Sequence, residues 1–359
     1  MKNTAVVGLV LNELDVLAGT KLIEQSGGNT GNILFTHGVC SQVYRPQIIG
    51  FQFSSKSELI NTDYSSVVIP AANWIDTSSD WGFLADALEK IEVPICCVGL
   101  GAQIPISEIG GIRPGTLRFL ELLARKCSVI GLRGEKTAEI LRALGIENTV
   151  VCGCPSMYTE LRSFHAPVLP EYGSATRLSM SFTRYTKDDS DDAAQRPVAR
   201  LAAQAASSII LQSEIIEANW LANSSTEDAT WLSHYYGISP DLIQSIYDRL
   251  HIFGSYKAWI DFHINNTDLT ITSRIHGAIA SYLAGKPAFL LTHDQRTSEL
   301  GESMGIPSIP ISDAQNPNKL LNAEYLNRIY DRDKFNVKHG ENLTTLKKLY
   351  SQCNVLTIN

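Results

Sequence analysis

The sequence has no excess of positive charge and no long apolar run, and both absences exclude classes of protein. Lys and Arg together number 30 against 37 Asp and Glu, so the net charge is −7 with histidine neutral. A surface of this sign offers no electrostatic footprint for nucleic acid, so any anion must be bound locally. The apolar N-terminal stretch ends before Glu13 and is too short for a secretion signal or a bilayer span. We therefore expect a cytoplasmic protein with no transmembrane segment and no nucleic-acid partner.

Metal-binding signatures are also missing. The seven cysteines include no CxxC pair, and the neighbours Cys96 and Cys97 lie inside an apolar run. Buried thiols in a reducing compartment are the simplest interpretation, with a structural zinc site or a reactive thiol as alternatives. Segment 188–192 holds four acidic residues among five, which is more typical of a solvated charge cluster than of a metal site. We predict no metal and no cofactor.

The length of 359 residues corresponds to roughly two domains of about 150 residues each. In the first half, short apolar runs alternate with segments of helical period. This alternation predicts a doubly wound parallel sheet. Strands are expected at 4–9, 33–37, 66–70, 94–99, 128–132 and 149–152, and helices at 80–91, 115–126 and 136–145.

The pattern restarts after an interruption at 163–175, where proline and glycine break the periodicity. We therefore predict an N-terminal Rossmann-like domain over 1–165 and a second one over 175–312. Residues 313–359 form an amphipathic helical tail that is expected to pack back on the first domain. In the second half, strands are expected at 178–182, 209–212, 268–272 and 287–292, a polar loop at 183–192, and helices to about 206 and at 240–250 and 276–284.

No standard nucleotide-binding loop is present. Gly99 and Gly101 follow an apolar run, but Ile104 occupies the third glycine position of GxGxxG, and no GxxxxGK[ST] motif occurs. A nicotinamide cofactor is therefore excluded. Ligands of open parallel sheets bind beyond the carboxyl ends of the strands, so polar residues that follow predicted strands are the candidates. The glycine-rich segment 27–32 allows a close backbone approach, although a plain turn explains it equally well.

Charged side chains follow three of the predicted strands. Arg133 lies between a strand and a helix, where it could bind phosphate or carboxylate, or simply pair with Glu135 or Glu139 at the surface. Two further strands end in the densest clusters. These supply Arg274 and His276 after the first, and His293, Asp294, Arg296 and Glu299 after the second.

These segments together resemble the polysaccharide pyruvyl transferase family over about residues 28–310. Many relatives have an acid where this chain has Asn32 and an aspartate where it has Gly134, and both departures concern the acceptor side. The C-terminal signature is the more specific part. It comprises Arg274-Ile275-His276-Gly277, Gly285-Lys286-Pro287, Asp294-Gln295-Arg296, Glu299-Leu300 and Gly305-Ile306-Pro307, preceded by Asn29-Thr30-Gly31-Asn32, Val98-Gly99-Leu100-Gly101-Ala102-Gln103, Arg133, Leu144-Gly145-Ile146 and Gly153-Cys154-Pro155-Ser156.

The resemblance implies a GT-B-like fold, with two doubly wound Rossmann-like domains facing each other across a cleft. It also implies transfer of pyruvate from phosphoenolpyruvate to two hydroxyls of a sugar as a cyclic ketal, with release of phosphate. The residue types suit this donor, because arginine pairs bidentately with phosphate and carboxylate. Arg133, Arg296, Arg274 and Gly277 are the expected donor-binding residues.

Protonation of the donor's methylene group requires a positioned acid. Histidine suits this step because its ordinary pKa of about 6.5 lies near working pH and a neighbouring phosphate favours its charged form. His276 is the expected general acid. Arg274 binds in the same pocket or orients the histidine loop, and Asp294 either accepts the sugar's proton or holds Arg296, as Glu299 could also do.

The acceptor is expected on the N-terminal side of the cleft. Asn29, Asn32, Gln103 and Trp74 are the predicted acceptor-binding residues, with Asn73, Asp76 and Trp81 as further candidates. An indole can stack on a sugar face, but a core position explains either tryptophan as well.

Two other functions fit parts of the pattern. A GT-B glycosyltransferase with a nucleotide-sugar donor would use the same two halves, because fold alone does not fix function. A non-catalytic carbohydrate-binding or assembly protein is the third reading, which the gathered arginines and histidine argue against. The acceptor could be nucleotide-linked, lipid-linked or polymeric, and both a homo-oligomer and peripheral membrane association are compatible with the sequence.

Overall fold

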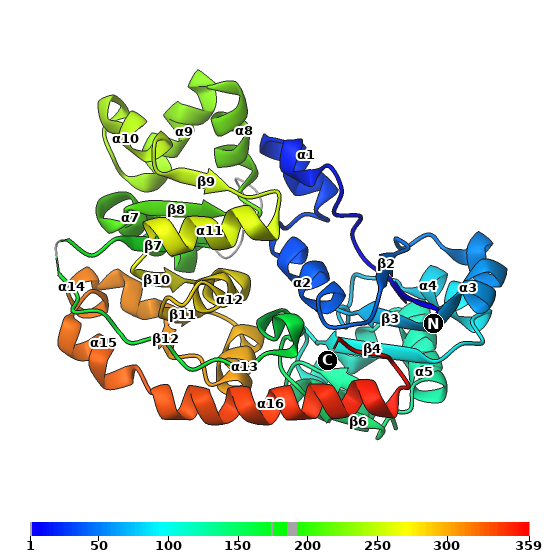
Figure 1. Cartoon of the computed structure of the whole chain (residues 1–359). Coiled ribbons are helices and arrows are strands. Elements are labelled where there is room, and N and C mark those ends of the chain that lie inside the picture. Colours follow the sequence, from blue (N-terminus) through cyan, green and yellow to red (C-terminus); the bar gives the residue numbers. More distant parts are fainter. Residues whose placement is uncertain (1, 174, 185–191, 359) are drawn as a thin grey trace.

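The computed structural model describes residues 2–173, 175–184 and 192–358, and it has two halves that are each built on one parallel sheet (Figure 1). The first sheet has the strand order β2-β1-β3-β4-β5-β6, and every neighbouring pair is parallel. Its strands are β1 (Asn3–Val6), β2 (Pro46–Ile48), β3 (Tyr64–Pro70), β4 (Ile95–Leu100), β5 (Ile130–Leu132) and β6 (Thr149–Val151).

The second sheet has the order β12-β11-β10-β7-β8-β9 and is also parallel throughout. In this order the chain winds in one direction from β7 to β9 and in the other from β10 to β12. The switch point between β7 and β10 is where such sheets open a crevice for ligands. The strands are β7 (Leu178–Ser181), β8 (Ser208–Leu211), β9 (Leu250–Ile252), β10 (Leu269–Thr272), β11 (Ala288–Thr292) and β12 (Ser308–Pro310).

Helices cover both faces of each sheet, which confirms the doubly wound prediction. Along β3, Val67 and Ile69 pack into one core with α4 and α5, whereas Val68 between them packs into another core with α2 and α16. The α-helices are α1 (Gly19–Gln25), α2 (Gly31–Cys40), α3 (Ser57–Asp63), α4 (Gly82–Glu89), α5 (Pro114–Lys126), α6 (Glu135–Ala143), α7 (Asp192–Ala205), α8 (Ile215–Asn223), α9 (Thr226–Tyr236), α10 (Gln244–Tyr247), α11 (Tyr256–Asn266), α12 (Ile275–Leu283), α13 (Gln295–Met304), α14 (Pro317–Leu320), α15 (Ala323–Ile329) and α16 (Arg332–Gln352).

One predicted strand is wrong in a way that matters for the site. Residues 33–37 were expected as a strand, but they lie inside α2, whose Ile33, Leu34 and Phe35 are all buried. A short, wholly apolar run has the same appearance in a buried strand and in a buried helix, so periodicity cannot separate the two. The glycine-rich segment before it therefore leads into a helix N-terminus rather than into a strand.

The remaining differences concern short elements. The edge strands β2, β9 and β12 have three residues each and were not expected, because so short a run carries no readable alternation. The helix expected at 240–250 is instead a 3₁₀ turn at Pro240–Leu242, the single turn α10, and then the start of β9 at Leu250.

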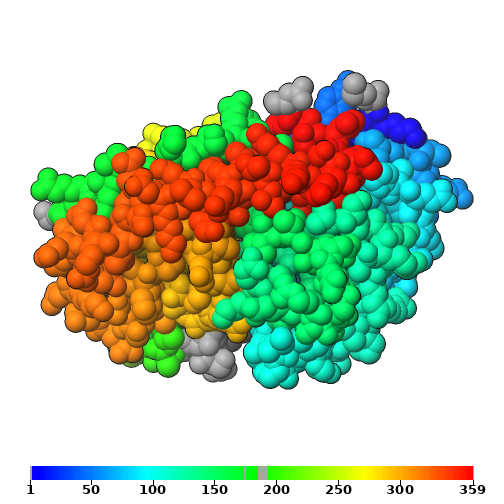
Figure 2. Space-filling model, turned by 90° about the horizontal axis from the view of Figure 1, so that it is seen from below, coloured from blue at the N-terminus to red at the C-terminus, as the bar shows by residue number. Residues whose placement is uncertain are grey.

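One of the hydrophobic cores is built by residues of both halves. Helix α16 runs beneath both sheets, as Figure 1 shows from the side and Figure 2 from below. Its Leu346 and Leu349 are fully buried in a cluster that contains Val68 from the first sheet and Leu290 from the second. Burial of each leucine contributes about 1.5–3 kcal/mol. Helix α16 thus packs on the first half and on the second half together.

Membrane insertion finds no structural support in the described part of the chain. None of its helices is both long enough and apolar enough to span a bilayer.

Candidate active site

The strand ends of both sheets meet at a cavity of about 80 Å³ between the two halves. Residues that follow β3 and β5 face residues that follow β8, β10 and β11 across it, and the N-terminal turns of α2 and α12 close it. Arg133, Arg274, His276 and Arg296, which are distant in sequence, therefore converge at one place. The lining residues are Asn29, Asn32, Ala72, Asn73, Arg133, Gln212, Ser273, Arg274, Ile275, His276, Arg296, Thr297 and Leu300.

Arg133 is a buried cation that forms no ion pair with a carboxylate in the part of the chain that the structure describes. Its side chain is 3% exposed and lies over the ring of Phe35, 5.0 Å from the ring centroid. Nη1 donates to Oδ1 of Asn73 at 3.0 Å, while Nε and Nη2 have no hydrogen-bond partner among the described residues. Burial lowers the pKa of this guanidinium, since removing a charge from water is costly. The arrangement leaves two buried donors unsatisfied on a side chain that lines the cavity, and a bound anion could satisfy them.

His276 is held in the first turn of α12. Its ring packs against Gly31 of α2 so closely that a Cβ atom at Gly31 would lie 2.4 Å from Nδ1, and Nε2 lies 3.9 Å from the Cys154 Sγ. Burial, followed by the positive charges of Arg133, Arg274 and Arg296, lowers the pKa of His276 to about 3. The pKa thus lies well below the ordinary value of about 6.5, and the imidazole is uncharged at neutral pH in this structure.

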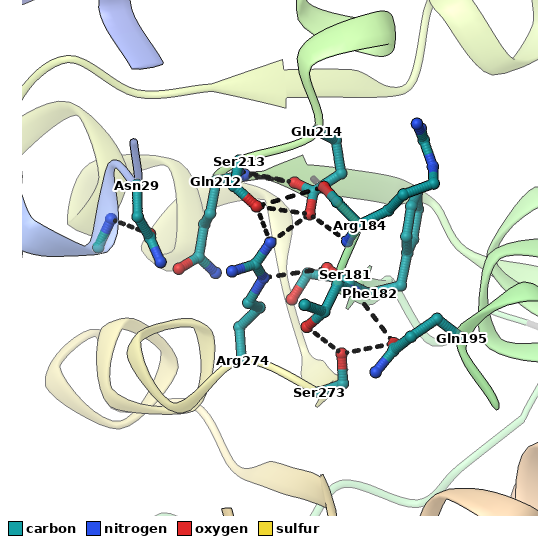
Figure 3. A network of polar contacts seen from close by, with 12 residues as sticks. Asn29, Ser181, Phe182, Arg184, Gln195, Gln212, Ser213, Glu214, Ser273 and Arg274 are labelled. Atoms are coloured by element: carbon teal, nitrogen blue, oxygen red, sulfur yellow. Dashed lines mark hydrogen bonds and ion pairs between the residues drawn. The ribbon is translucent and has the colours of Figure 1, made fainter. Parts of the chain in front are cut away.

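Arg274 is fully engaged within its own half (Figure 3). Its Nη2 pairs with Glu214 Oε1 at 2.5 Å and contacts Ser213 Oγ, and its Nε donates to the Phe182 carbonyl at 3.2 Å. Although it lines the cavity, it has less capacity left for a ligand than Arg133. This geometry favours the alternative that Arg274 orients the loop carrying His276.

Glu214 lies just after the end of β8, where its carboxylate binds the backbone N–H groups of the loop. Its Oε2 accepts hydrogen bonds from the backbone N–H groups of Gln212 at 2.7 Å and Ser213 at 3.0 Å. Burial opposes the charged form, but Arg274 and these donors outweigh it and lower the pKa of Glu214. An anion entering the cavity is thereby directed away from β8 and toward Arg133.

Arg296 bridges the two halves at the mouth of the cavity. Its Nη1 donates to Gln103 Oε1 at 3.1 Å, across the cleft, and its Nη2 pairs with Asp294 Oδ2 at 3.2 Å. Asp294 is also the N-cap of α13, accepting from the Thr297 N–H at 2.6 Å. Asp294 therefore holds Arg296 in place and caps the helix. Both contacts fit the holding role of Asp294 better than a role in proton transfer.

Comparison with models of known protein families identifies the family of this chain. The model for polysaccharide pyruvyl transferase matches residues 29–295, about three quarters of the chain. The chain belongs to the polysaccharide pyruvyl transferase family. A search of curated protein sequences finds no match.

Solved structures show that this pyruvyl transferase family member has a GT-B-like fold. The UDP co-structure of MnaA from S. aureus is 12% identical, with a TM-score of 0.51 over 99% of this chain and 97% of that one. A protein of Listeria monocytogenes, described as a UDP-N-acetylglucosamine 2-epimerase, is 12% identical with a TM-score of 0.50 over 98% and 97%. Identities this low establish the fold alone.

Glu299 explains one departure from the family pattern. This side chain crosses from α13 to the other half, and its Oε1 accepts from the Thr137 N–H at 3.0 Å, at the start of α6. A carboxylate at a helix N-terminus is stabilised by the free N–H groups there. We call this contact between Glu299 and Thr137 the clasp between the halves. A Cβ atom at Gly134 would lie 2.2 Å from Glu299 Cγ, so only glycine leaves room for it.

We expect Gly134→Ala to lower the free energy of unfolding by about 1–3 kcal/mol, the usual cost of overpacking. The backbone at Gly134 is extended, so the effect comes from the collision with Glu299 and not from strain. Thermal denaturation measures it. In a Glu299→Ala background the same substitution should cost much less, and Gly110→Ala, where no atom lies within 4 Å of the added Cβ, is the control. Equal costs in both backgrounds would contradict the clasp.

Three of the four predicted acceptor-binding residues line cavities between the two halves, and the fourth, Trp74, does not. Asn29 and Asn32 line the cavity and hold the turn that opens α2, since Asn29 Oδ1 accepts from the Gly31 N–H at 2.8 Å and Asn32 Nδ2 donates to the Ser26 carbonyl at 3.0 Å. Gln103 stands at the adjoining cavity with Arg296. Each of these three can still reach a ligand in the cleft.

Trp74 requires a correction. It is 7% exposed and sits in the core of the first half, stacked on Trp81 at 4.3 Å between ring centroids and packed against Phe119. Both faces of its ring are covered, so it cannot stack on a sugar. Asp76 accepts from Ser78 and Ser79 and shapes a turn. The core alternative therefore accounts for Trp74, and Trp81 is partly buried against the same core.

Gly277 lies inside α12 and is not among the residues that line the cavity. A Cβ atom there would meet Thr272 Oγ1 at 2.8 Å, so its place is the packing of α12 against β10 rather than direct contact with a donor.

Gln212 and Ser273 are among the lining residues that the sequence did not single out. Gln212 and Ser273 each follow directly on a strand of the second sheet, β8 and β10. The rule used for the charged residues would have found them, but neutral polar side chains after a strand are too common to stand out.

The thiols contribute no visible metal site. Cys96, Cys97 and Cys152 are fully buried, and the described residues contain no group of three His, Cys, Asp or Glu side chains able to hold an ion. Most of the acidic segment at 188–192 lies outside the described residues. The prediction that no metal takes part stays a prediction.

Proposed function

We propose that this protein transfers the pyruvyl group of phosphoenolpyruvate to two hydroxyls of a sugar, forming a cyclic ketal and releasing phosphate, in polysaccharide biosynthesis. The observation that carries the proposal is the pair of unpartnered guanidinium donors on Arg133 in the cavity that His276 also lines. A small dianion or trianion would satisfy both donors and would supply the negative charge that His276 needs to become protonated.

The proposed reaction begins with proton transfer to the donor. The His276 imidazolium gives a proton to the methylene carbon of the donor, which leaves an oxocarbenium-like centre at C2. One sugar hydroxyl forms a C–O bond to C2 and loses its proton to the imidazole. The bond between C2 and the phosphate oxygen then breaks, and the second hydroxyl attacks C2 while its proton leaves with the phosphate. No cofactor or metal is required.

The size of the cavity supports a small donor. About 80 Å³ suits a compact anion, whereas pockets for larger ligands usually have 300–1,000 Å³. A separate cavity of about 680 Å³ opens at the end of β1. Its lining residue Leu9 and the donor-cavity residue Asn32 both approach Gly27, at 3.8 and 3.3 Å from a Cβ built there. We propose that the acceptor sugar enters from this side.

The deciding experiment is mass spectrometry after incubation with phosphoenolpyruvate and a panel of nucleotide-linked, lipid-linked and polymeric sugars. We expect one acceptor to gain the mass of a pyruvate ketal, with one phosphate released for each ketal formed. Glycosyl transfer from a nucleotide sugar, with no ketal, would show the glycosyltransferase alternative to be right. Binding of sugars without any turnover would favour the non-catalytic alternative.

A cytoplasmic location belongs to the same proposal. All seven cysteines are free thiols, which suits a reducing compartment.

A further inference from the structure

The side chain of Gln212 is buried in the cavity with nothing to bind. It is 1% exposed, and both its Nε2 and its Oε1 lack a hydrogen-bond partner among the described residues. A buried amide in this state destabilises the fold, so such groups are rare unless a ligand completes them. Gln42 shows the ordinary case, because its Nε2 donates to two carbonyls and its Oε1 accepts from Tyr350 at 2.7 Å.

The backbone around Gln212 is fixed from both halves of the protein. Its N–H donates to Glu214 Oε2 at 2.7 Å, and its carbonyl accepts from the N–H of Thr30, across the cleft, at 3.0 Å. Figure 3 shows the amide pointing between Asn29 on one side and Arg274 on the other. The side chain is thus held between the proposed acceptor and donor residues, and only its amide end is uncommitted.

We propose that Gln212 is a positioning residue that contacts both substrates. The Nε2 group donates to an anionic oxygen of the donor bound at Arg133. The Oε1 atom accepts the O–H of the second sugar hydroxyl while the first attacks C2, which holds the acceptor in line with that carbon and leaves the first hydroxyl's proton to His276. This inference rests on the proposed function. It specifies that the acceptor presents a neutral hydroxyl at Gln212, since the amide oxygen can only accept a hydrogen bond and needs an O–H donor.

The chemistry favours an amide at this point over an acid. A glutamate would place a second negative charge beside the donor anion, in a cavity where Arg133 pairs with no carboxylate of the described residues. The amide offers the same acceptor oxygen without that repulsion. Proton transfer stays with His276, and Gln212 only fixes the geometry of attack.

The test compares Gln212→Leu and Gln212→Glu in the full-length protein. We expect Gln212→Leu to reduce kcat/KM about 10- to 100-fold, the value of one or two lost hydrogen bonds, with a melting temperature equal to or above wild type. We expect Gln212→Glu to weaken phosphoenolpyruvate binding more than Gln212→Leu does, while its acceptor KM stays closer to wild type.

Gln42→Leu is the matched control, since it removes a buried glutamine whose bonds are all made. It should lower the melting temperature and leave both KM values unchanged. Wild-type kinetics in Gln212→Leu would overturn the inference, as would a loss of activity that is matched by an equal loss of stability.

Calorimetry with phosphoenolpyruvate separates this inference from the proposed function. If wild type binds the donor but forms no ketal, the proposed function fails, and the donor contact of Gln212 is still judged by the affinities of the two variants. If wild type forms the ketal and both variants match it, the role of Gln212 alone is wrong. If wild type does not bind phosphoenolpyruvate at all, both proposals fail.

Discussion

Replacement of His276 by alanine is expected to reduce pyruvyl transfer by about 10²- to 10⁴-fold, the usual contribution of a positioned general acid. Donor binding should stay measurable, because Arg133 and Arg296 lie on other elements and keep their positions. Turnover under saturating substrates and the phosphoenolpyruvate Kd from calorimetry give the two quantities separately. Unchanged turnover would remove His276 from the mechanism.

His263 provides a control of the same kind. It is fully buried, burial lowers its pKa to about 3, and it bonds to Trp259 and Thr267 within α11 and its end, away from the cavity. His263→Ala should therefore lower the melting temperature and leave the kcat of the folded fraction intact. The comparison separates the loss of an acid from the loss of a buried imidazole.

Donor binding should also carry a proton into the site. With its pKa lowered to about 3, His276 is neutral in the folded protein at neutral pH, whereas the same imidazole in the unfolded chain, with a pKa near 6.5, binds a proton more readily. His276 therefore contributes stability that is present above pH 6.5 and is lost as pH falls toward 3. A bound phosphate and carboxylate reverse this bias, and the imidazole takes up a proton.

Calorimetric titrations in two buffers of different ionisation enthalpy measure this uptake, at a pH where phosphoenolpyruvate is fully ionised. We expect a buffer-dependent heat in wild type that disappears in His276→Ala. A heat that is independent of buffer in wild type would show that the acid is already charged before binding.

Arg133→Leu is expected to weaken phosphoenolpyruvate binding by about 10²- to 10⁴-fold, since two charge-assisted hydrogen bonds contribute about 1.5–3 kcal/mol each. Arg133→Lys should fall between this variant and wild type, because it keeps the charge but loses the two-pronged geometry. Neither substitution should lower the melting temperature much, as Arg133 has no carboxylate partner to leave behind. Fluorescence or calorimetric titration and thermal denaturation provide the two measurements.

Arg184 supplies the contrast. It is equally buried but pairs with Glu217, so Arg184→Leu leaves an uncompensated carboxylate in the interior. We expect that change to destabilise the fold by about 3–5 kcal/mol. If Arg133→Leu proves as destabilising as Arg184→Leu and donor affinity is retained, Arg133 is structural and the donor site lies elsewhere.

The charged residues of the site could be found from the sequence, because the strands that carry them are strongly apolar and each ends abruptly. Arg133 follows β5 and Arg274 follows β10, and in a parallel sheet such positions gather at one edge. Trp74 could not be placed in this way. An aromatic residue after a strand looks the same whether it faces a cleft or the core, and here Trp81 and Phe119 cover it.

What each side chain does was decided by partners that lie far away in the sequence. Arg274 and Arg133 look equivalent in the chain, yet Glu214 neutralises only the first. In the sequence, Gly134 stands where many relatives have an acidic residue. In the structure, the side chain of Glu299 from α13 fills the space beside it. The sequence alone assigns His276 the ordinary pKa of histidine. Burial between the two halves removes the imidazole from water and lowers that pKa.

The order of apolar and polar residues along this chain was enough to specify two doubly wound sheets and the loops that carry its arginines and its histidine, because periodicity and strand ends are local properties. Which guanidinium is left without a counter-ion, which imidazole is kept neutral and which amide is left unsatisfied were settled only when the two halves packed together. Charge compensation and desolvation depend on distances in space, and a linear sequence does not contain them.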